Sequence, residues 1–468
     1  MSSDTFSHEN GKRLSPLFWL LLSGAVIRLL LWGWFYGRTP EIFDEKYLYS
    51  AIAENLVQRG EFADEPGRIT SKRPPLYPAF VAGIYFLFGV DNYNAVRLIQ
   101  SILSLGTVAI IYQLGRRLYN PRVGWWAASF CCFYPSLLIY NNLLLAEVLF
   151  TFLLCGGVYL MVLYFQQNRW IWLVFAGATL AFAAMTRSVL WLYPPVMIVV
   201  LMLQRDKSWR GRFAASALFT CAFAAVLAPW AVRNTLLQKT LVVVDATGGR
   251  NFMMGNYRDT PLHRPWDAIA LSGEQAWYSQ LDAPRDVAGE LTQGQIDKLA
   301  LRAGLRFVAE YPALTAKRDV LKFFHLWQLE RELIAGAYLH YFGPIPTWGI
   351  LLSAVLILGA YVCTLLGGVI GIVLTPPPDR PIHFLLLSFI LFVTGMHVLA
   401  FGHSRYHLPL MPLIFLYCAA AVTQLRGIWS RRFRPAFCLA VVLSGIFMSS
   451  WTWEIAVQER DHLAHINR

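Results

Sequence analysis

Long apolar runs separated by short polar loops recur from one end of the chain to the other. A run of about twenty apolar residues is long enough to cross a bilayer as a helix. Such segments occur at 14–36, 95–114, 123–140, 144–165, 170–186, 188–204, 213–231, 345–374, 382–402, 407–425 and 434–453. The pattern therefore predicts an all-α polytopic membrane protein with about 11 (11–13) transmembrane helices.

One further apolar segment, Pro74–Val90, fits a crossing helix less well. As a helix from Pro75 to Val90 it would be about 24 Å long, shorter than the ~30 Å hydrocarbon core. Its opening Pro-Pro is typical of a helix start. Counting it as a span would also move every basic loop that follows to the opposite side of the membrane. We therefore expect an outer-face juxtamembrane helix here.

The loops between the predicted spans are rich in Lys and Arg, which collect on the cytoplasmic side of membrane proteins. The basic loops are Arg116–Arg122, Arg169, Gln204–Arg212 and Leu425–Arg434. They share one side if the N-terminus is cytoplasmic and the chain crosses eleven times. This predicts a multi-pass plasma (inner) membrane protein with two large outer segments, 37–94 and 231–343. The second contains a predicted amphipathic helix, Gly294–Pro312.

The predicted organisation has three parts. An N-terminal transmembrane catalytic module covers 1–230 and includes the outer loop 37–94. A small outer-face helical region covers 231–343, and C-terminal transmembrane helices cover 344–468.

Composition agrees with the membrane assignment. Of the 468 residues, 56% are hydrophobic and 15% are charged, whereas soluble proteins carry about a quarter charged residues. The net charge of +12 would suit a nucleic-acid partner, but the cations lie in loops at the membrane surface. There they meet anionic membrane lipids, so no nucleic acid is expected.

The first outer loop carries an acidic pair, Asp44 and Glu45, at the start of an amphipathic helical pattern. One interpretation is a helix cap, because acids stabilise a helix N-terminus. The other is chemistry at the membrane surface. Lys72 and Arg73 follow in the same loop, where a cation pair can bind a phosphate or lipid headgroups.

Further candidates lie at predicted outer helix ends. Glu147 lies at the outer mouth of the predicted span 144–165, and a carboxylate there needs a partner or a water-filled cavity. Cations on the outer side run against the positive-inside bias, and an anionic ligand would explain them. These residues are Arg187, Arg233 and the loop "FGHSRYHLPLMP" with His403, Arg405 and Tyr406. A divalent metal at Asp44, Glu45 or His403 is left open, since the spacing is weak evidence.

Several motifs in order resemble those of the GT-C membrane glycosyltransferases. They are the acidic pair, "RPPLYP", "NAVRLIQSILSLGTVAIIYQLGRRLY", "APWAVRN", "GGRNFMMGN" and "SRYHLPLMP". The group that the chain resembles contains protein O-mannosyltransferases and bacterial aminoarabinose (lipid A) transferases. The resemblance spans about Ala25 to Thr423 and implies a GT-C-type fold.

The resemblance also implies an activity. Such enzymes move a sugar from a polyprenyl-phosphate carrier to an acceptor hydroxyl on the outer face, with inversion. Asp44 matches the general base, Glu45 the second acid, and Lys72 or Arg73 the residue contacting the donor phosphate. Glu147 lies near a second acidic position, and Arg405 matches the Arg of an "RY..P..P" loop. A lipid, glycan or protein could be the acceptor. The alternatives are a transporter, or an undecaprenyl-linked glycan polymerase or ligase.

Overall fold

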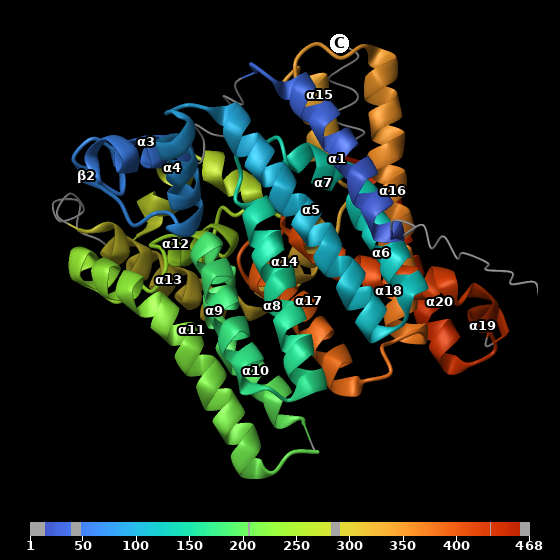
Figure 1. Ribbon diagram of the computed structural model, residues 1–468. Helices are drawn as coiled ribbons and strands as arrows, with labels where there is room; N and C mark the ends of the chain where they lie inside the picture. The colour runs from blue at the N-terminus through green and yellow to red at the C-terminus, as the bar shows by residue number, and fades with distance from the viewer. Residues whose placement is uncertain (1–14, 39–47, 205, 282–290, 431, 459–468) are drawn as a thin grey trace, which may run out of the picture.

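The computed structural model describes residues 15–38, 48–204, 206–281, 291–430 and 432–458. Within these ranges the protein is helical apart from one short hairpin (Figure 1). The helices are α1 (Pro16–Phe35), α3 (Tyr49–Arg59), α4 (Leu76–Phe88), α5 (Tyr93–Leu118), α6 (Pro121–Phe133), α7 (Pro135–Tyr140), α8 (Glu147–Gln167), α9 (Trp170–Thr186), α10 (Pro194–Met202), α11 (Trp209–Gln238), α12 (Gly248–Gly255), α13 (Gln293–Glu310), α14 (Pro312–Leu326), α15 (Glu332–Tyr338), α16 (Thr347–Leu374), α17 (Arg380–Leu399), α18 (Met411–Thr423), α19 (Leu425–Ser430) and α20 (Pro435–Trp453). The hairpin pairs β1 (Ala63–Glu65) antiparallel to β2 (Arg68–Ile69).

Eight helical segments of the described chain are long and apolar enough to cross a membrane. The all-α membrane fold predicted from the sequence is thus confirmed, but the count of eleven crossings is not. The other three predicted segments are helical too, in shorter pieces. Residues 123–140 divide between α6 and α7 at Pro135, 170–186 form the 17-residue α9, and 188–204 form a 3-10 turn followed by α10. Proline at the first turn of α7 and α10 explains two of the breaks.

The enclosed spanning segments lie at the centre and the open ones at the edge. The segment containing α18 is 83% buried and α8 is 67% buried, whereas α20 is only 11% buried. Helix α8 packs against α5 and α9, and α18 packs against α6 and α16. Close approach of α5 and α6 requires glycine, because a Cβ on Gly115 would lie 2.7 Å from the Cα of Gly124.

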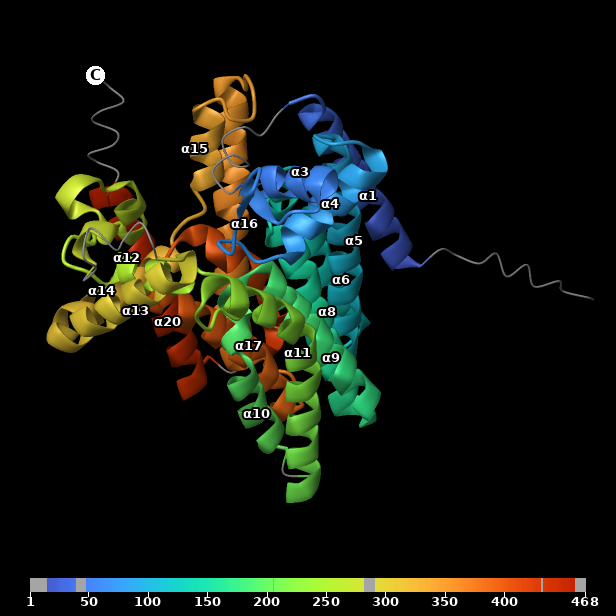
Figure 2. The same ribbon diagram turned by 90° about the vertical axis from the view of Figure 1, so that its left-hand side faces the viewer.

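Shorter helices cover one end of this bundle. Helix α4 has 13 residues, about 20 Å in length, which is less than the hydrocarbon core requires. It packs against α3 at one side of α5 (Figures 1 and 2). Helix α13 forms where the amphipathic pattern predicted it and packs on α12. Helix α11 continues to Gln238, so the division expected after residue 230 falls inside a helix.

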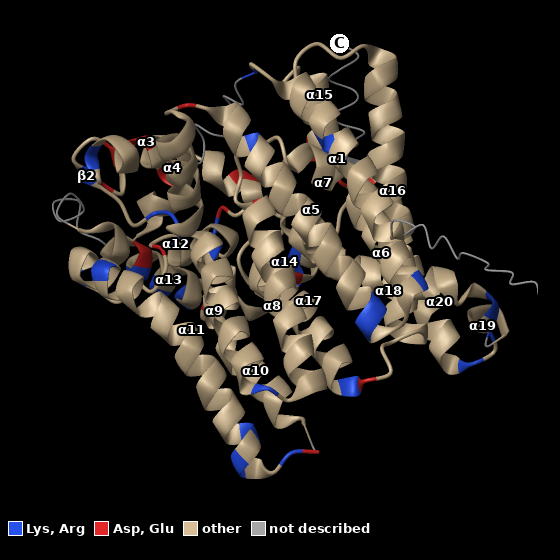
Figure 3. Ribbon diagram, viewed as in Figure 1, with Lys and Arg blue, Asp and Glu red and all other residues tan. Residues whose placement is uncertain are grey.

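Charged residues are unevenly distributed along the helix axes. In Figure 3, Lys and Arg occupy the lower end of α11 and the surroundings of α19 and α20, whereas both signs of charge mix around α3, α12 and α13. The mixed end holds the outer segments predicted from the sequence. The candidate functional residues that the structure describes also belong to this end.

Candidate functional site

A buried carboxylate held by two arginines forms the centre of the site. Glu147, at the first position of α8, is 1% exposed. It accepts hydrogen bonds from Nη1 of Arg187 at 2.9 Å and from Nε of Arg405 at 2.5 Å. Arg187 is the residue at which α9 ends, and Arg405 lies in the 3-10 turn Ser404–Leu410 before α18. Three segments far apart in sequence therefore meet through one ion-pair cluster.

Aromatic rings enclose this cluster. The guanidinium of Arg187 lies 4.7 Å from the ring centroid of Tyr406. The ring of His397 stacks on Tyr406, with 4.4 Å between the ring centroids. His403 accepts a hydrogen bond at Nδ1 from the backbone N–H of Arg405. The predicted residues Glu147, Arg187, Arg405 and Tyr406 are thus brought together.

Glycines set the position of the loop that carries Arg405. A Cβ on Gly402 would lie 1.9 Å from the carbonyl oxygen of Lys322, and one on Gly255 would lie 1.6 Å from that of Ala400. Lys322, fully buried in α14, donates to Oδ1 of Asn256 at 3.0 Å. These contacts fasten the loop between α12 and α14, so only glycine fits at both crossings.

The segment 37–94, which the sequence analysis predicted to be an outer segment, reaches the same cluster through Tyr49. Burial raises the pKa of the Tyr49 hydroxyl, and Arg73 acts against that shift. The charges of Glu147, Arg405 and Arg187 also act on this phenol, so α3 lies within electrostatic reach of the arginine cluster. The guanidinium of Arg73 is 6.0 Å from the Tyr49 ring centroid.

Arg250, at the start of α12, adds a cation next to Arg73. Burial lowers the pKa of the Arg250 guanidinium, and the positive charge of Arg73 lowers it further. The carboxylate of Asp297 opposes this shift and accepts the backbone N–H groups of Gly249 and Arg250 at 3.1 and 2.8 Å. This caps α12 and fixes Arg250 in place.

Two predicted cations have other partners. Nζ of Lys72 lies 3.9 Å from Oδ2 of Asp64, in the hairpin. Arg233 donates to the carbonyl of Thr70 at 3.1 Å and to Oδ1 of Asn234 at 2.7 Å, fastening α11 to the first outer segment. Of the pair Lys72 and Arg73, it is Arg73 that faces Tyr49 and Arg250.

The acidic pair Asp44 and Glu45 lies outside the described residues. The chain is described again from Leu48, beside Tyr49. On the other side, the buried Arg97 donates to the carbonyls of Phe35 at 2.7 Å and Arg38 at 2.6 Å. Both flanks of residues 39–47 are therefore attached to the bundle.

A cavity of about 460 Å³ adjoins the cluster. Its walls include His263, Trp266, His325, Arg331, Glu332 and His403. Glu332 and Ser404 also line a small pocket that reaches Arg405 and Tyr140. Among the residues that the structure describes, no group of three His, Cys, Asp or Glu side chains could hold a metal ion. A divalent metal at Asp44, Glu45 or His403 stays open, since Asp44 and Glu45 lie outside the described residues.

Sequence reasoning missed three residues of the site. Arg250 lies in "GGRNFMMGN", a stretch noted for its resemblance but not for its arginine. Tyr49 lies in the amphipathic helical pattern that follows the acidic pair, and nothing in that pattern singles it out. The third is Asp245. Burial raises the pKa of its carboxyl, which accepts a hydrogen bond from Ser188, the residue after Arg187. No sequence pattern singled out Asp245.

Comparison with known proteins identifies the fold. Residues 72–232, about a third of the chain, match the dolichyl-phosphate-mannose-protein mannosyltransferase family. The oligosaccharyltransferase AglB of Archaeoglobus fulgidus, in complex with an inhibitory peptide and a dolichol-phosphate, superposes with a TM-score of 0.52 at 11% identity, covering 93% of this chain and 54% of that one. The apo form of the A. fulgidus enzyme gives 0.50 at 13% identity, with 93% and 55% covered.

ArnT of Cupriavidus metallidurans in the apo state matches with a TM-score of 0.39 at 13% identity, covering 90% of this chain and 82% of that chain. No curated protein matches the sequence. The chain spans about half the length of the archaeal enzyme. It has the GT-C fold of membrane glycosyltransferases, as its motifs predicted. Its central segment resembles the protein mannosyltransferases in particular.

Proposed function

We propose that the protein is a glycosyltransferase that moves a sugar from a polyprenyl-phosphate carrier to an acceptor hydroxyl on the outer face of the membrane, with inversion. The observation that carries this proposal is the gathering of Arg73, Arg187 and Arg405 around Tyr49 and Glu147, with Arg250 next to Arg73. Guanidinium groups gathered at one place suit a phosphate, because each can bind phosphate oxygens through paired N–H groups.

The charge arrangement suits a phosphate leaving group. Burial is the main cause of the lowered pKa of Arg250, and the nearby positive charge of Arg73 adds to it. The Nε atom of Arg250 is buried and has no hydrogen-bond partner among the described residues. An anion between the two guanidiniums would interact favourably with both, since guanidinium binds phosphate through paired N–H groups.

In the proposed reaction the acceptor oxygen attacks the anomeric carbon of the donor. The acceptor proton passes to a carboxylate base, for which Asp44 is our proposal, with Glu45 beside it. The bond between the anomeric carbon and the phosphate oxygen breaks, and polyprenyl phosphate leaves as an anion. Arg73 and Arg250 stabilise the charge that develops on that oxygen. Glu147 holds Arg187 and Arg405 in place and is a positioning residue.

The test is transfer of radiolabelled sugar from a panel of polyprenyl-phosphate sugars by purified protein in a membrane mimetic. Arg73→Gln should lower kcat/KM by ~10²–10³, the effect of removing one donor to a developing oxyanion. The matched control is Lys72→Gln, because the neighbouring cation pairs with Asp64. Equal losses of kcat/KM in both variants would contradict the assignment of Arg73. A third variant, Asp44→Asn, tests the base, and undiminished transfer by it would remove Asp44 from the mechanism.

A further inference from the structure

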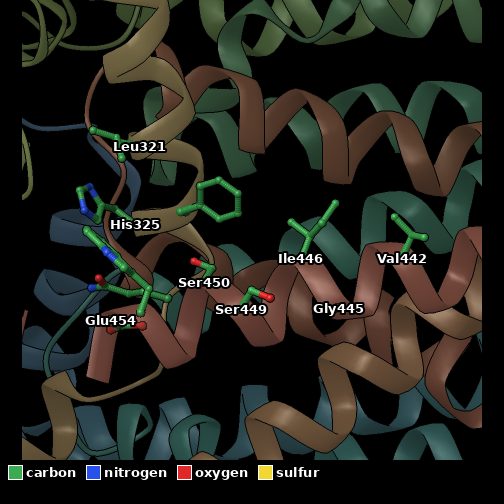
Figure 4. A pocket seen from close by; sticks show the side chains of 11 residues that line it. Leu321, His325, Val442, Gly445, Ile446, Ser449, Ser450 and Glu454 are labelled. Atoms are coloured by element: carbon green, nitrogen blue, oxygen red, sulfur yellow. The ribbon is translucent and has the colours of Figure 1, made fainter. Parts of the chain in front are cut away.

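An apolar groove of about 570 Å³ lies between α14 and α20, apart from the arginine cluster. Leu321 and Phe324 of α14 and Val442, Gly445 and Ile446 of α20 are among its lining residues. Figure 4 shows Leu321 beside His325, and Ile446, Gly445 and Val442 following one another along α20. Helix α20 is the least enclosed of the eight spanning segments. The groove is therefore accessible from the part of the surface that hydrocarbon covers.

The groove has one polar end. Figure 4 shows Val442 and Ile446 toward one end and His325 and Glu454 at the other. His325 and Gln328 line both the groove and the 460 Å³ cavity, so the two spaces share a wall. The cavity in turn shares Glu332 and Ser404 with the small pocket at Arg405. The groove, the cavity and the small pocket are thus neighbours, and the last of them is lined by Arg405.

His325 is the feature at this junction that calls for a ligand. The side chain is 7% exposed, and its Nδ1 atom is buried without a hydrogen-bond partner among the described residues. A buried polar atom without a hydrogen bond destabilises the fold. A hydroxyl group in the cavity would supply the missing hydrogen bond.

The cations around the cavity are already matched with carboxylates. Arg264 lies 3.3 Å from Asp267, and Arg331 lies 2.5 Å from Glu454. Paired charges of both signs suit an uncharged, hydroxyl-bearing head group better than a phosphate, which would compete with the carboxylates. The indole of Trp266 also lines the cavity and offers an apolar surface to a sugar ring.

We propose that this groove and cavity bind the acceptor, and that the acceptor is a glycolipid. Its hydrocarbon chain lies between α14 and α20, and its sugar head group lies in the cavity against His325. The proposal rests on the glycosyltransferase function proposed above and names its acceptor class. The acceptor hydroxyl then reaches the arginine cluster past Glu332 and Ser404.

The chain offers a matched pair of variants for a binding test. A Cβ on Gly445 would meet nothing within 4 Å, so Gly445→Phe fills the groove without disturbing the backbone. Gly359 of α16 is also exposed and open, and it does not line the groove. Gly359→Phe therefore adds the same side chain to a spanning helix elsewhere.

The experiment uses photocrosslinking in phosphatidylcholine nanodiscs, with peptides identified by mass spectrometry. Three probes carry a diazirine in the hydrocarbon chain: a glucosyl diacylglycerol, a phosphatidylglycerol and a polyprenyl phosphate. The glycolipid probe should label α14 and α20 in the wild type and in Gly359→Phe. Gly445→Phe should lower that labelling ~10-fold, equal to about 1.4 kcal/mol of binding. His325→Leu should lower it similarly, and His325→Gln should retain it.

The outcomes separate the two proposals because crosslinking needs no turnover. Preferential labelling of the groove by phosphatidylglycerol or polyprenyl phosphate would overturn the glycolipid assignment, as would labelling unchanged in Gly445→Phe. Transfer to a glycolipid that persists in Gly445→Phe would also overturn it. Specific glycolipid labelling by a protein that transfers no sugar from any donor would instead overturn the proposed function.

Discussion

Replacing Glu147 by glutamine keeps its shape but removes the charge that holds two buried arginines. Glu147 is 1% exposed, and Arg405 is 8% exposed. Removing one partner of a buried ion pair costs about 3–5 kcal/mol, because the opposite charge stays buried and uncompensated. Arg405→Gln should cost less, about 1.5–3 kcal/mol, the range of a hydrogen bond to a charged group. Glu147 then still pairs with Arg187.

The double variant Glu147→Gln/Arg405→Gln removes one charge of each sign. Its destabilisation should therefore be smaller than the sum of the two single effects by about 1–3 kcal/mol. The measurement is unfolding of the purified variants in detergent. At about 2–4 °C per kcal/mol in smaller proteins, and less in a longer chain, Glu147→Gln should lower the apparent Tm by roughly 5 °C.

The control is Glu54→Gln, since Glu54 accepts a hydrogen bond from Gln58 on the exposed part of α3. It should change stability by less than about 0.5 kcal/mol. The reasoning fails if Glu147→Gln is as harmless as the control. It also fails if the two single effects add within about 0.5 kcal/mol, the behaviour of independent sites.

Two further variants test the packing and the titration of the site. Gly402→Ala should lower the free energy of unfolding by at least about 1–3 kcal/mol, because its Cβ would lie 1.9 Å from the Lys322 carbonyl oxygen. The control Gly359→Ala, where space is open, should have the Tm of the wild type. Equal Tm values of the two variants would contradict the close crossing at Gly402. Burial lowers the pKa of His325 to about 4, with further lowering by His263, Arg264 and His403. The unfolded state therefore binds a proton near pH 6.5 that the folded state does not, so stability falls as the pH drops from about 6.5 to 4. His325→Gln should flatten that part of the pH–stability curve, and an unchanged slope would refute the burial argument.

The spanning helices could be predicted from the sequence because the requirement for apolar residues is local. Each predicted span is helical where the structure describes it. The number of single crossing helices could not be predicted, because Pro135 and Pro194 begin new helices within apolar runs that read as continuous. Hydropathy alone does not reveal where such a run changes direction.

The candidate site could be predicted only where a single charged residue lies next to an apolar run, because burying an unpaired charge is unfavourable. Glu147 and Arg405 are charged residues next to apolar runs, so each called for a partner, although the sequence could not say that they pair. Arg233 and Arg187 are both cations at predicted outer helix ends. Arg233, however, joins α11 to the segment before α4 by donating to the carbonyl of Thr70. Arg250 and Tyr49 join the site only through contacts between α3, α12 and the first outer loop, and no local pattern contains those contacts.

The two spaces at this end of the bundle differ in their charged groups, and that difference matches the two proposed substrates. Arg73 and Arg250 place two guanidinium groups near each other, and guanidinium groups bind phosphate through paired N–H groups. In the cavity, by contrast, Arg264 and Arg331 each face a carboxylate. A phosphate is therefore favoured at the first place and an uncharged head group at the second. Since the intervening pocket is lined by Arg405, the arginine cluster is where a donor phosphate and an acceptor hydroxyl would meet.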